Sequence, residues 1–172
     1  CRTPRELYFV KRNLDGRRRR VLAYGGASRF HPASVHNIAE LIRLAAPRPG
    51  TRVLNAVDPE APTVAEIAAA IDAVMGVETE DVLLDGPPAP GGVGGTPWSV
   101  PVPVVCDMTE ARRQLGYRPV VRYAETLPET VAFIEERLAG RDWREAYPKM
   151  FENYGDLFAY AAEDAWPAAR RA

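Results

Sequence analysis

The sequence predicts one mixed domain of the α/β or α+β class. Its 172 residues are enough to bury a sizeable hydrophobic core within a single domain. Along the chain, segments in which apolar residues recur at helical spacing alternate with short segments of strand period. Most connections between these segments are short, as they are in compact mixed domains.

The first half of the chain alternates helix and strand. Thr63 with Glu66 has the pattern of a capping box, and it marks the start of the third helix. Asn37 is a good N-cap for the second helix. The expected helices are 4–14, 38–46 and 64–76, and the expected strands are 18–24, 51–57 and 81–84.

The second half begins with an irregular stretch at 86–103 that holds six prolines and five glycines. A connection of this length inside a compact domain is typical of a lid or a binding loop. Asp107 is expected to cap a helix at 108–115, and a longer helix is expected at 127–138. We expect a final helix to pack onto its own domain, the alternative being an interface with another chain. Its aromatic stripe consists of Trp143, Tyr147, Phe151, Tyr154 and Phe158.

Charge and cysteine content exclude several classes of protein. The chain carries 22 basic and 23 acidic residues, so it lacks the basic excess of a nucleic-acid-binding domain. The basic run Arg17 to Arg20 is interpreted as the solvated edge of a hairpin. Two cysteines are too few for a disulfide framework or a zinc cage. No apolar run reaches the roughly 20 residues of a membrane helix, and no signal-peptide pattern is present. We therefore expect a cytoplasmic protein with no membrane or nucleic-acid partner.

Two further patterns are weak as functional motifs. His31 and His36 are five residues apart, which aligns two metal ligands neither on a helix nor on one face of a strand, so no metal site is predicted. The glycine run 91–95 lacks the helix start that follows a phosphate-binding loop. In addition, Pro97 stands where a dinucleotide fingerprint needs its third glycine. We interpret this run as a flexible loop and a candidate lid.

Three stretches of sequence occur in a characteristic order. Residues 29–39 read Arg-Phe-His-Pro-Ala-Ser-Val-His-Asn-Ile-Ala. Residues 53–57 read Val-Leu-Asn-Ala-Val, followed at 62–67 by Pro-Thr-Val-Ala-Glu-Ile. Residues 107–119 read Asp-Met-Thr-Glu-Ala-Arg-Arg-Gln-Leu-Gly-Tyr-Arg-Pro. Together, across 25–138, they resemble the carboxy-terminal half of the extended short-chain dehydrogenases/reductases, the NAD-dependent epimerase/dehydratase group.

This resemblance implies an α/β fold: the substrate-binding lobe of an extended Rossmann-type enzyme, with a small mixed sheet and packed helices. The cofactor-binding lobe is absent from the sequence. Of the 22 basic residues only Lys11 and Lys149 are lysines, and neither stands four positions after a tyrosine, so the family's Tyr-x-x-x-Lys pair is missing. We therefore assign no catalytic and no cofactor-binding residue to this chain. In the intact enzyme, NAD or NADP would be bound mainly by the missing amino-terminal lobe.

The residues expected to face a small-molecule substrate are Arg29, His36 and Trp98, with 91–95 as a candidate lid. The resemblance implies a role for Arg29, because nucleotide-sugar members usually carry an arginine near this position and a second one in the later loop. The loop at 86–103 contains no arginine and so departs from the nucleotide-sugar pattern.

Two hypotheses about function follow. In the first, the chain is the carboxy-terminal portion of an NAD(P)-dependent reductase, epimerase or dehydratase and is inactive by itself. Residues 1–140 are then the substrate-binding lobe and 141–172 an aromatic-striped helical extension, and a homodimer is compatible with this view. The chain begins with Cys1, as expected of a piece of something longer. In the second, it is a stand-alone, non-catalytic binding or scaffold module derived from that lobe. A missing lobe leaves an exposed apolar surface, whereas a stand-alone module covers it with polar residues.

Overall fold

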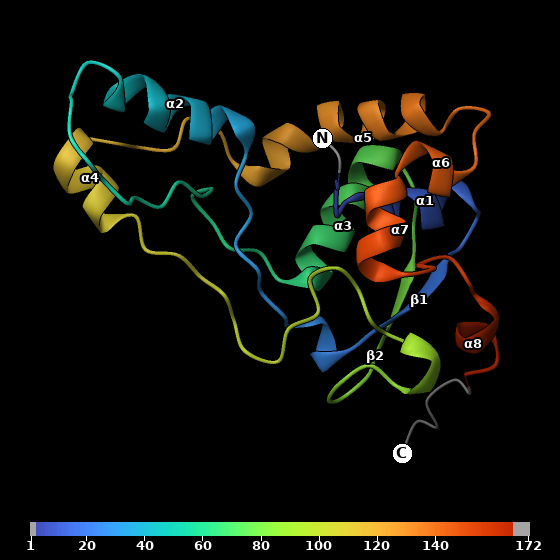
Figure 1. The fold of residues 1–172 in the computed structure, drawn as a ribbon. Coiled ribbons are helices and arrows are strands. Elements are labelled where there is room, and N and C mark those ends of the chain that lie inside the picture. Colours follow the sequence, from blue (N-terminus) through green and yellow to red (C-terminus); the bar gives the residue numbers. More distant parts are fainter. Residues whose placement is uncertain (1–2, 167–172) are drawn as a thin grey trace.

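The computed structural model describes residues 3–166, and Figure 1 shows their arrangement. Helices dominate this part of the chain, and single 3₁₀ turns occur at Tyr24–Gly26 and Pro90–Gly92. The two strands are β1 (Arg19–Leu22) and β2 (Glu80–Leu83). The helices are α1 (Leu7–Leu14), α2 (Val35–Ala45), α3 (Val64–Met75), α4 (Thr109–Leu115), α5 (Tyr123–Leu138), α6 (Trp143–Ala146), α7 (Pro148–Tyr154) and α8 (Ala161–Asp164).

The sheet is smaller and simpler than expected. Within residues 3–166 its two strands run parallel, with Arg19 opposite Glu80 and Leu22 opposite Leu83, so the prediction of a mixed sheet is wrong. The prediction of a strand at 51–57 is also wrong, because this extended segment pairs with no strand in the described chain. A strand needs a neighbour to bond its backbone groups, and none is present here.

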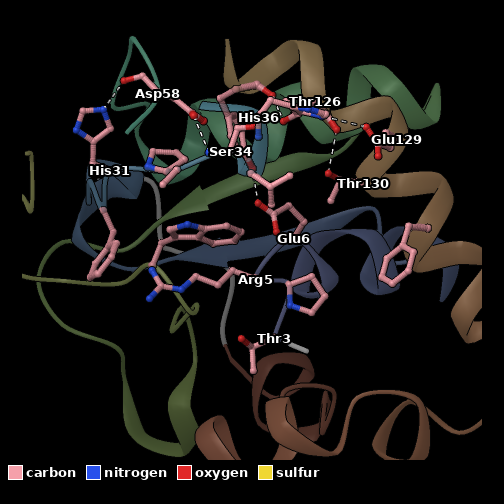
Figure 2. Close-up of a pocket in the computed structure, with 18 residues that line it drawn as sticks. Thr3, Arg5, Glu6, His31, Ser34, His36, Asp58, Thr126, Glu129 and Thr130 are labelled. Atoms are coloured by element: carbon pink, nitrogen blue, oxygen red, sulfur yellow. Dashed lines mark hydrogen bonds and ion pairs between the residues drawn. The ribbon is translucent and has the colours of Figure 1, made fainter. Parts of the chain in front are cut away.

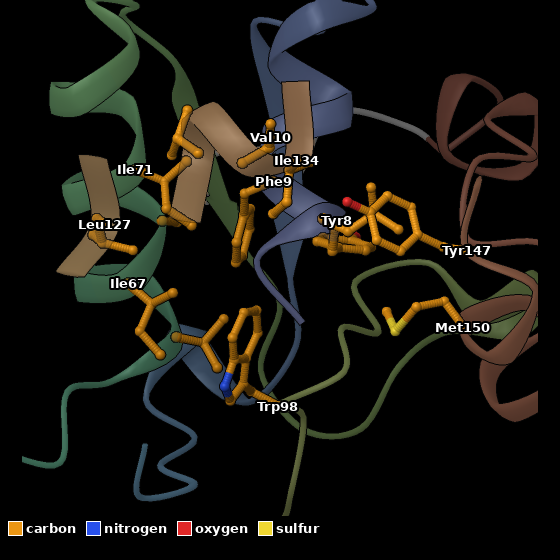
Figure 3. Close-up of a cluster of buried hydrophobic side chains, with 14 of the residues drawn as sticks. Tyr8, Phe9, Val10, Ile67, Ile71, Trp98, Leu127, Ile134, Tyr147 and Met150 are labelled. Carbon is orange, nitrogen blue, oxygen red and sulfur yellow. The ribbon is translucent and has the colours of Figure 1, made fainter. Parts of the chain in front are cut away.

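The hydrophobic core forms where α1, α3 and α5 meet, and α6 and α7 add to it (Figure 3). Phe9 of α1 is fully buried, and its ring stacks on that of Trp98 with centroids 5.8 Å apart. The stretch 86–103 is irregular, as expected, but Trp98 anchors it in the core. A second anchor is the hydrogen bond that the Ala23 amide donates to the Gly94 carbonyl at 2.9 Å.

Helix starts show where local signals succeed and fail. The capping box of Thr63 and Glu66 opens α3 as predicted, and Gly76 ends that helix in the left-handed conformation. The prediction of Asn37 as N-cap of the second helix is wrong. Ser34 caps α2 instead, and Asn37 is a fully buried residue of its first turn. Asp107 accepts the Thr109 amide at 2.7 Å where α4 begins.

The single aromatic helix expected after residue 142 is wrong, because the segment forms two short helices and a turn. Pro148 has no N–H with which to continue α6, and Gly155 at φ +70° follows the end of α7. As a result, Trp143 and Tyr147 are buried in the core, whereas Phe151 and Tyr154 are exposed.

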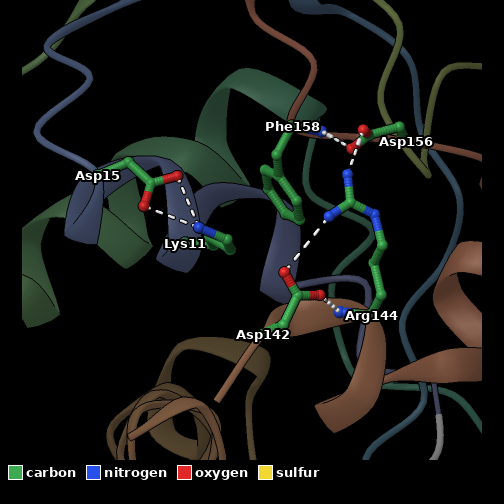
Figure 4. Close-up of polar contacts among 6 residues, drawn as sticks. All are labelled: Lys11, Asp15, Asp142, Arg144, Asp156 and Phe158. Carbon is green, nitrogen blue, oxygen red and sulfur yellow. Dashed lines mark hydrogen bonds and ion pairs between the residues drawn. The ribbon is translucent and has the colours of Figure 1, made fainter. Parts of the chain in front are cut away.

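Polar contacts hold the end of this segment near α1 (Figure 4). Arg144 bridges Asp142 and Asp156 through its two Nη atoms, at 3.3 and 2.6 Å. Lys11 of α1, which is paired with Asp15 at 2.8 Å, lies over the Phe158 ring.

The basic run Arg17 to Arg20 is not a solvated hairpin edge, so that interpretation is wrong. Arg19 and Arg20 begin β1, which pairs in parallel with the distant strand β2, and Arg20 is only 4% exposed. Its guanidinium donates to both carboxylate oxygens of Asp72, at 3.1 and 2.9 Å. Packing against α3 therefore turns an apparently surface arginine into a core ion pair. None of the helices within residues 3–166 combines the length and the apolar character needed to cross a membrane.

Candidate functional site

A pocket of about 620 Å³ lies where the start of α1, the start of α2 and the first half of α5 approach one another (Figure 2). Residues 3–6 and 30–36 form two of its walls, and Asp58 and Trp98 contribute to it from other segments. The lining of α5 consists of Tyr123, Thr126, Glu129, Thr130 and Phe133. Segments far apart in the sequence therefore build one concave surface, as ligand sites usually require.

A buried polar hub fixes the shape of this pocket. Asp58 accepts the Ser34 amide and the Asn37 side-chain amide through Oδ1, both at 2.7 Å. Asn37 also accepts the amides of Val120 and Val121 through its own Oδ1, at 2.7 and 3.1 Å. The hub thus joins the entrance to α2 with the segment that leads into α5.

His31 is a second fixed element of the wall. Its Nδ1 accepts the Cys106 amide at 3.2 Å, so this nitrogen carries no proton. Its Nε2 is therefore the protonated nitrogen, and it donates to the Asp58 carbonyl at 2.9 Å. In this arrangement the imidazole is neutral.

Glu6 and Tyr123 form a hydrogen-bonded pair inside the pocket. The Tyr123 hydroxyl donates to Glu6 Oε1 at 3.1 Å. Burial raises the pKa of the Glu6 carboxyl, and burial together with the nearby Glu6 charge raises the pKa of Tyr123 well above its ordinary value. Within residues 3–166, Glu6 Oε2 has no side-chain partner, so it is the atom of this pair that can meet a ligand.

The pocket contains two of the three predicted substrate-facing residues. His36 lies across from Glu129, with its Nε2 3.5 Å from that carboxylate, and Trp98 forms part of the wall. Arg29 is not a lining residue, because its guanidinium donates to the Ala61 carbonyl and lies 3.7 Å from Glu66. The contact of all three with substrate stays a prediction.

The predicted lid lies elsewhere. Gly91, Gly92 and Gly95 line a second cavity of about 490 Å³, together with Tyr8 and Arg12 of α1. This cavity shares no lining residue with the first one. The glycine run is therefore separate from the pocket that holds His36, and its role as a lid stays a prediction.

Sequence reasoning missed four functional candidates in the pocket: Glu6, Asp58, Tyr123 and Glu129. One local signal was available for Asp58, an acidic residue that directly follows an apolar stretch. Glu6 and Tyr123 are 117 positions apart, so no spacing rule relates them.

Neither a metal nor a dinucleotide site is formed in the described chain. Residues 3–166 bring no group of three or more His, Cys, Asp or Glu side chains together for a metal ion. Neither strand leads directly into a helix whose first amides face a pyrophosphate. A 3₁₀ turn and an extended segment follow β1, and β2 enters the irregular stretch. These residues do not fit a nicotinamide cofactor.

Comparisons with known proteins identify the fold. No protein-family model and no curated protein matches the sequence. A solved UDP-glucose 4-epimerase of Thermotoga maritima, with UDP-glucose, is 22% identical with a TM-score of 0.56, and the match covers 76% of this chain and 38% of the epimerase.

Two further solved structures are similar to this chain in fold over a similar share of their length. A dTDP-glucose 4,6-dehydratase of Bacillus anthracis in complex with NAD is 15% identical with a TM-score of 0.59, and the match covers 86% of this chain and 43% of the dehydratase. RMD of Pseudomonas aeruginosa complexed with NADPH is 15% identical with a TM-score of 0.56, over 77% and 42% of the two chains. The chain therefore has the fold of part of these enzymes and spans about two fifths of their length.

Proposed function

We propose that this chain is the carboxy-terminal, substrate-binding portion of an NAD(P)-dependent reductase, epimerase or dehydratase. Its fold likeness to nicotinamide-dependent enzymes, over about two fifths of their length, supports this view. In the intact enzyme, NAD or NADP supplies hydride chemistry and is bound by an amino-terminal lobe. The 620 Å³ pocket holds the substrate, with His36, Trp98 and Glu6 as its contacts.

The observation that carries this proposal is an uncovered apolar face on α2. Val35, Ile38 and Ile42 follow one another at helical spacing, and Val35 and Ile42 are 72% and 62% exposed. In a complete globular domain such a stripe faces the hydrophobic core. Here it faces outward, although α2 contacts α4 and its first turn meets α5 through His36 and Glu129 (Figure 1).

The extended segment 51–57 adds to the same uncovered face. It makes no backbone–backbone hydrogen bond within residues 3–166, and its Val53 is 96% exposed. Free N–H and C=O groups on an extended segment are ready to pair with the edge of another sheet. An amino-terminal lobe that supplies this edge explains why a strand pattern is present without a strand.

The alternative, a stand-alone binding or scaffold module, predicts the opposite surface. Such a module would carry polar residues at the exposed positions of α2 and of 51–57. The valines and isoleucines at these positions favour the incomplete lobe.

The test is to express the chain alone and together with the coding region that precedes it, and to follow reduced nicotinamide by its absorbance with a panel of alcohols and ketones. We expect no turnover from the chain alone and NAD(P)-dependent turnover from the longer product. Robust turnover by these 172 residues alone would contradict the proposal. An inactive longer product that lacks a dinucleotide-binding region would favour the stand-alone module.

A further inference from the structure

The charges around the pocket are unevenly balanced. Arg5 lies beside Glu6 and offsets part of its charge, although its guanidinium is also 4.1 Å from the centroid of the Phe30 ring. Glu129 is opposite His36, which neutralises it when protonated. Glu6 therefore has a cationic neighbour within the pocket, and Glu129 has one when His36 is protonated.

Asp58 has no such neighbour. It is 1% exposed and forms no salt bridge within the described chain, and its Oδ2 is buried without a hydrogen-bond partner there. The only imidazole bonded to this residue is that of His31, which is neutral because Nδ1 accepts the Cys106 amide. A buried carboxylate without a compensating cation is costly, and it attracts positive charge to the nearest accessible space. That space is the pocket whose wall it forms.

Hydrogen-bond acceptors gather on the part of the pocket wall formed by α5 and Glu6, whereas Arg5, His36 and Trp98 are lining residues that carry donors. Thr126 and Thr130 both line it, and each donates its hydroxyl proton to a carbonyl one turn earlier in α5, at 2.8 and 2.9 Å. Only their oxygen lone pairs remain for a ligand. Glu6 Oε2 and the Glu129 carboxylate are acceptors as well. A protonated amine matches this surface, since it brings three donors and no acceptor.

We infer that the pocket binds a small organic ligand that carries a protonated amino group, with the ammonium near Glu6 and α5. The aromatic rings of Phe30 and Phe133 line the same space and favour a cation over an anion. The acidic lining residues Glu6, Asp58 and Glu129 disfavour a phosphate or diphosphate in the same position. This inference deepens the proposed function and rests on it in one respect, the use of this pocket as the substrate site.

The experiment measures binding of three matched probes to the 172-residue chain by calorimetry, without nicotinamide. The probes are D-glucosamine, D-glucose and D-glucose 6-phosphate, which share one ring and differ in charge. We expect glucosamine to bind at least about tenfold more tightly than glucose, and the phosphate to bind most weakly. Equal affinities, tightest binding of the phosphate, or no detectable binding of glucosamine overturns the inference.

Asp58→Asn removes the uncompensated charge and retains an oxygen that accepts from Ser34 and Asn37. It should reduce the preference for glucosamine over glucose to near unity, and an unchanged preference overturns the inference. Asp85→Asn is the matched control, because Asp85 is exposed and outside the pocket, and it should leave the preference intact. Circular dichroism checks that each variant folds. If Asp58→Asn does not fold, Glu6→Gln takes its place, and an unchanged preference in that variant overturns the inference.

Because no cofactor enters these measurements, the two proposals fail separately. If the longer product is inactive, the proposed function fails, but the preference of the chain for glucosamine is still tested by calorimetry. If that preference is not found, the inference about the ligand fails, but turnover by the longer product still tests the proposed function.

Discussion

Arg20 is a charged side chain that the fold has removed from water almost completely. It is held by Asp72, which also accepts hydrogen bonds from Asn13 at 2.8 Å and from Thr79 at 2.6 Å. Burial by itself would raise the pKa of Asp72, but the hydrogen bonds from Arg20, Thr79 and Asn13 outweigh it, and the pKa is lowered. This network joins α1, β1 and α3 at one point.

Replacement of Asp72 tests the network. Asp72→Asn leaves the buried Arg20 with less compensating charge, and we expect it to lower the free energy of unfolding by about 3 kcal/mol at neutral pH. Since the folded pKa of Asp72 is lowered, its contribution is present above the unfolded pKa and is lost as the pH falls through the folded pKa. The variant should therefore differ less from the wild type in acid. Urea unfolding at several pH values measures this.

The control for this prediction is Glu110→Gln. Glu110 pairs with Arg113 at 2.5 Å on the surface of α4, and both side chains are more than half exposed. A solvated pair of this kind contributes little, so no measurable loss of stability is expected. Similar losses in the two variants would show that burial is not what makes the Asp72 contact important.

Among the helices, α2 has an apolar stripe in its sequence but exposes that stripe to solvent. Its apolar stripe is typical of a core-facing helix, yet Asn37 is its only buried residue. Such a stripe is typical of a helix with an apolar partner, which in the proposed function is the amino-terminal lobe. The extended segment 51–57 likewise has the sequence pattern of a strand but no strand partner within residues 3–166.

Ile42→Glu tests this account of α2. Ile42 is exposed, so the stability of the chain alone should change little. Affinity for the product of the upstream coding region should fall by at least about tenfold, because a charge would enter an apolar interface. Sedimentation velocity and titration measure the two effects.

Arg43→Gln is the control on the same helix, since Arg43 is already polar and exposed. It should leave both properties unchanged. If Ile42→Glu unfolds the chain, then Ile42 is packed within it and the exposed stripe is not free to bind a partner. If the variant binds the upstream product as tightly as the wild type, then α2 does not contact that product.

At the scale of the whole molecule, the carboxy-terminal helices share the core of the rest of the chain. Trp143, Tyr147 and Met150 belong to the same buried cluster as Phe9 and Ile134 (Figure 3). We therefore expect residues 3–166 to unfold as one cooperative unit, although the sequence suggested a boundary at residue 140.

Trp143→Ala tests this cooperativity. The loss of a buried aromatic side chain should cost about 3–5 kcal/mol and lower the melting temperature of the entire chain in a single transition. Phe151→Ala, at an exposed position of the same segment, should cost much less. Two separate transitions, or a loss confined to the last helices, would support a distinct carboxy-terminal unit.

The accuracy of the sequence predictions follows the range of the interactions involved. The capping box at Thr63 needs only residues within one turn, and it was predicted correctly. The N-cap at Asn37 was predicted by the same kind of rule and was wrong, because Asp58, 21 positions away, holds its side chain in the core. In the pocket, His36 and Trp98 were predicted, whereas Glu6 and Tyr123 were not, since folding alone brings them together.

Local signals in the sequence predicted the positions of most helices, the two segments that form strands, the irregular stretch at 86–103 and the lack of a Tyr-x-x-x-Lys pair. These features depend on neighbouring residues or on composition. Tertiary packing, and not the local sequence, buries Arg20, leaves 51–57 without a strand partner within residues 3–166 and places His36 in one pocket with Glu6 and Glu129. Each of these depends on which distant segments fill the space around a residue, and packing in three dimensions sets that arrangement.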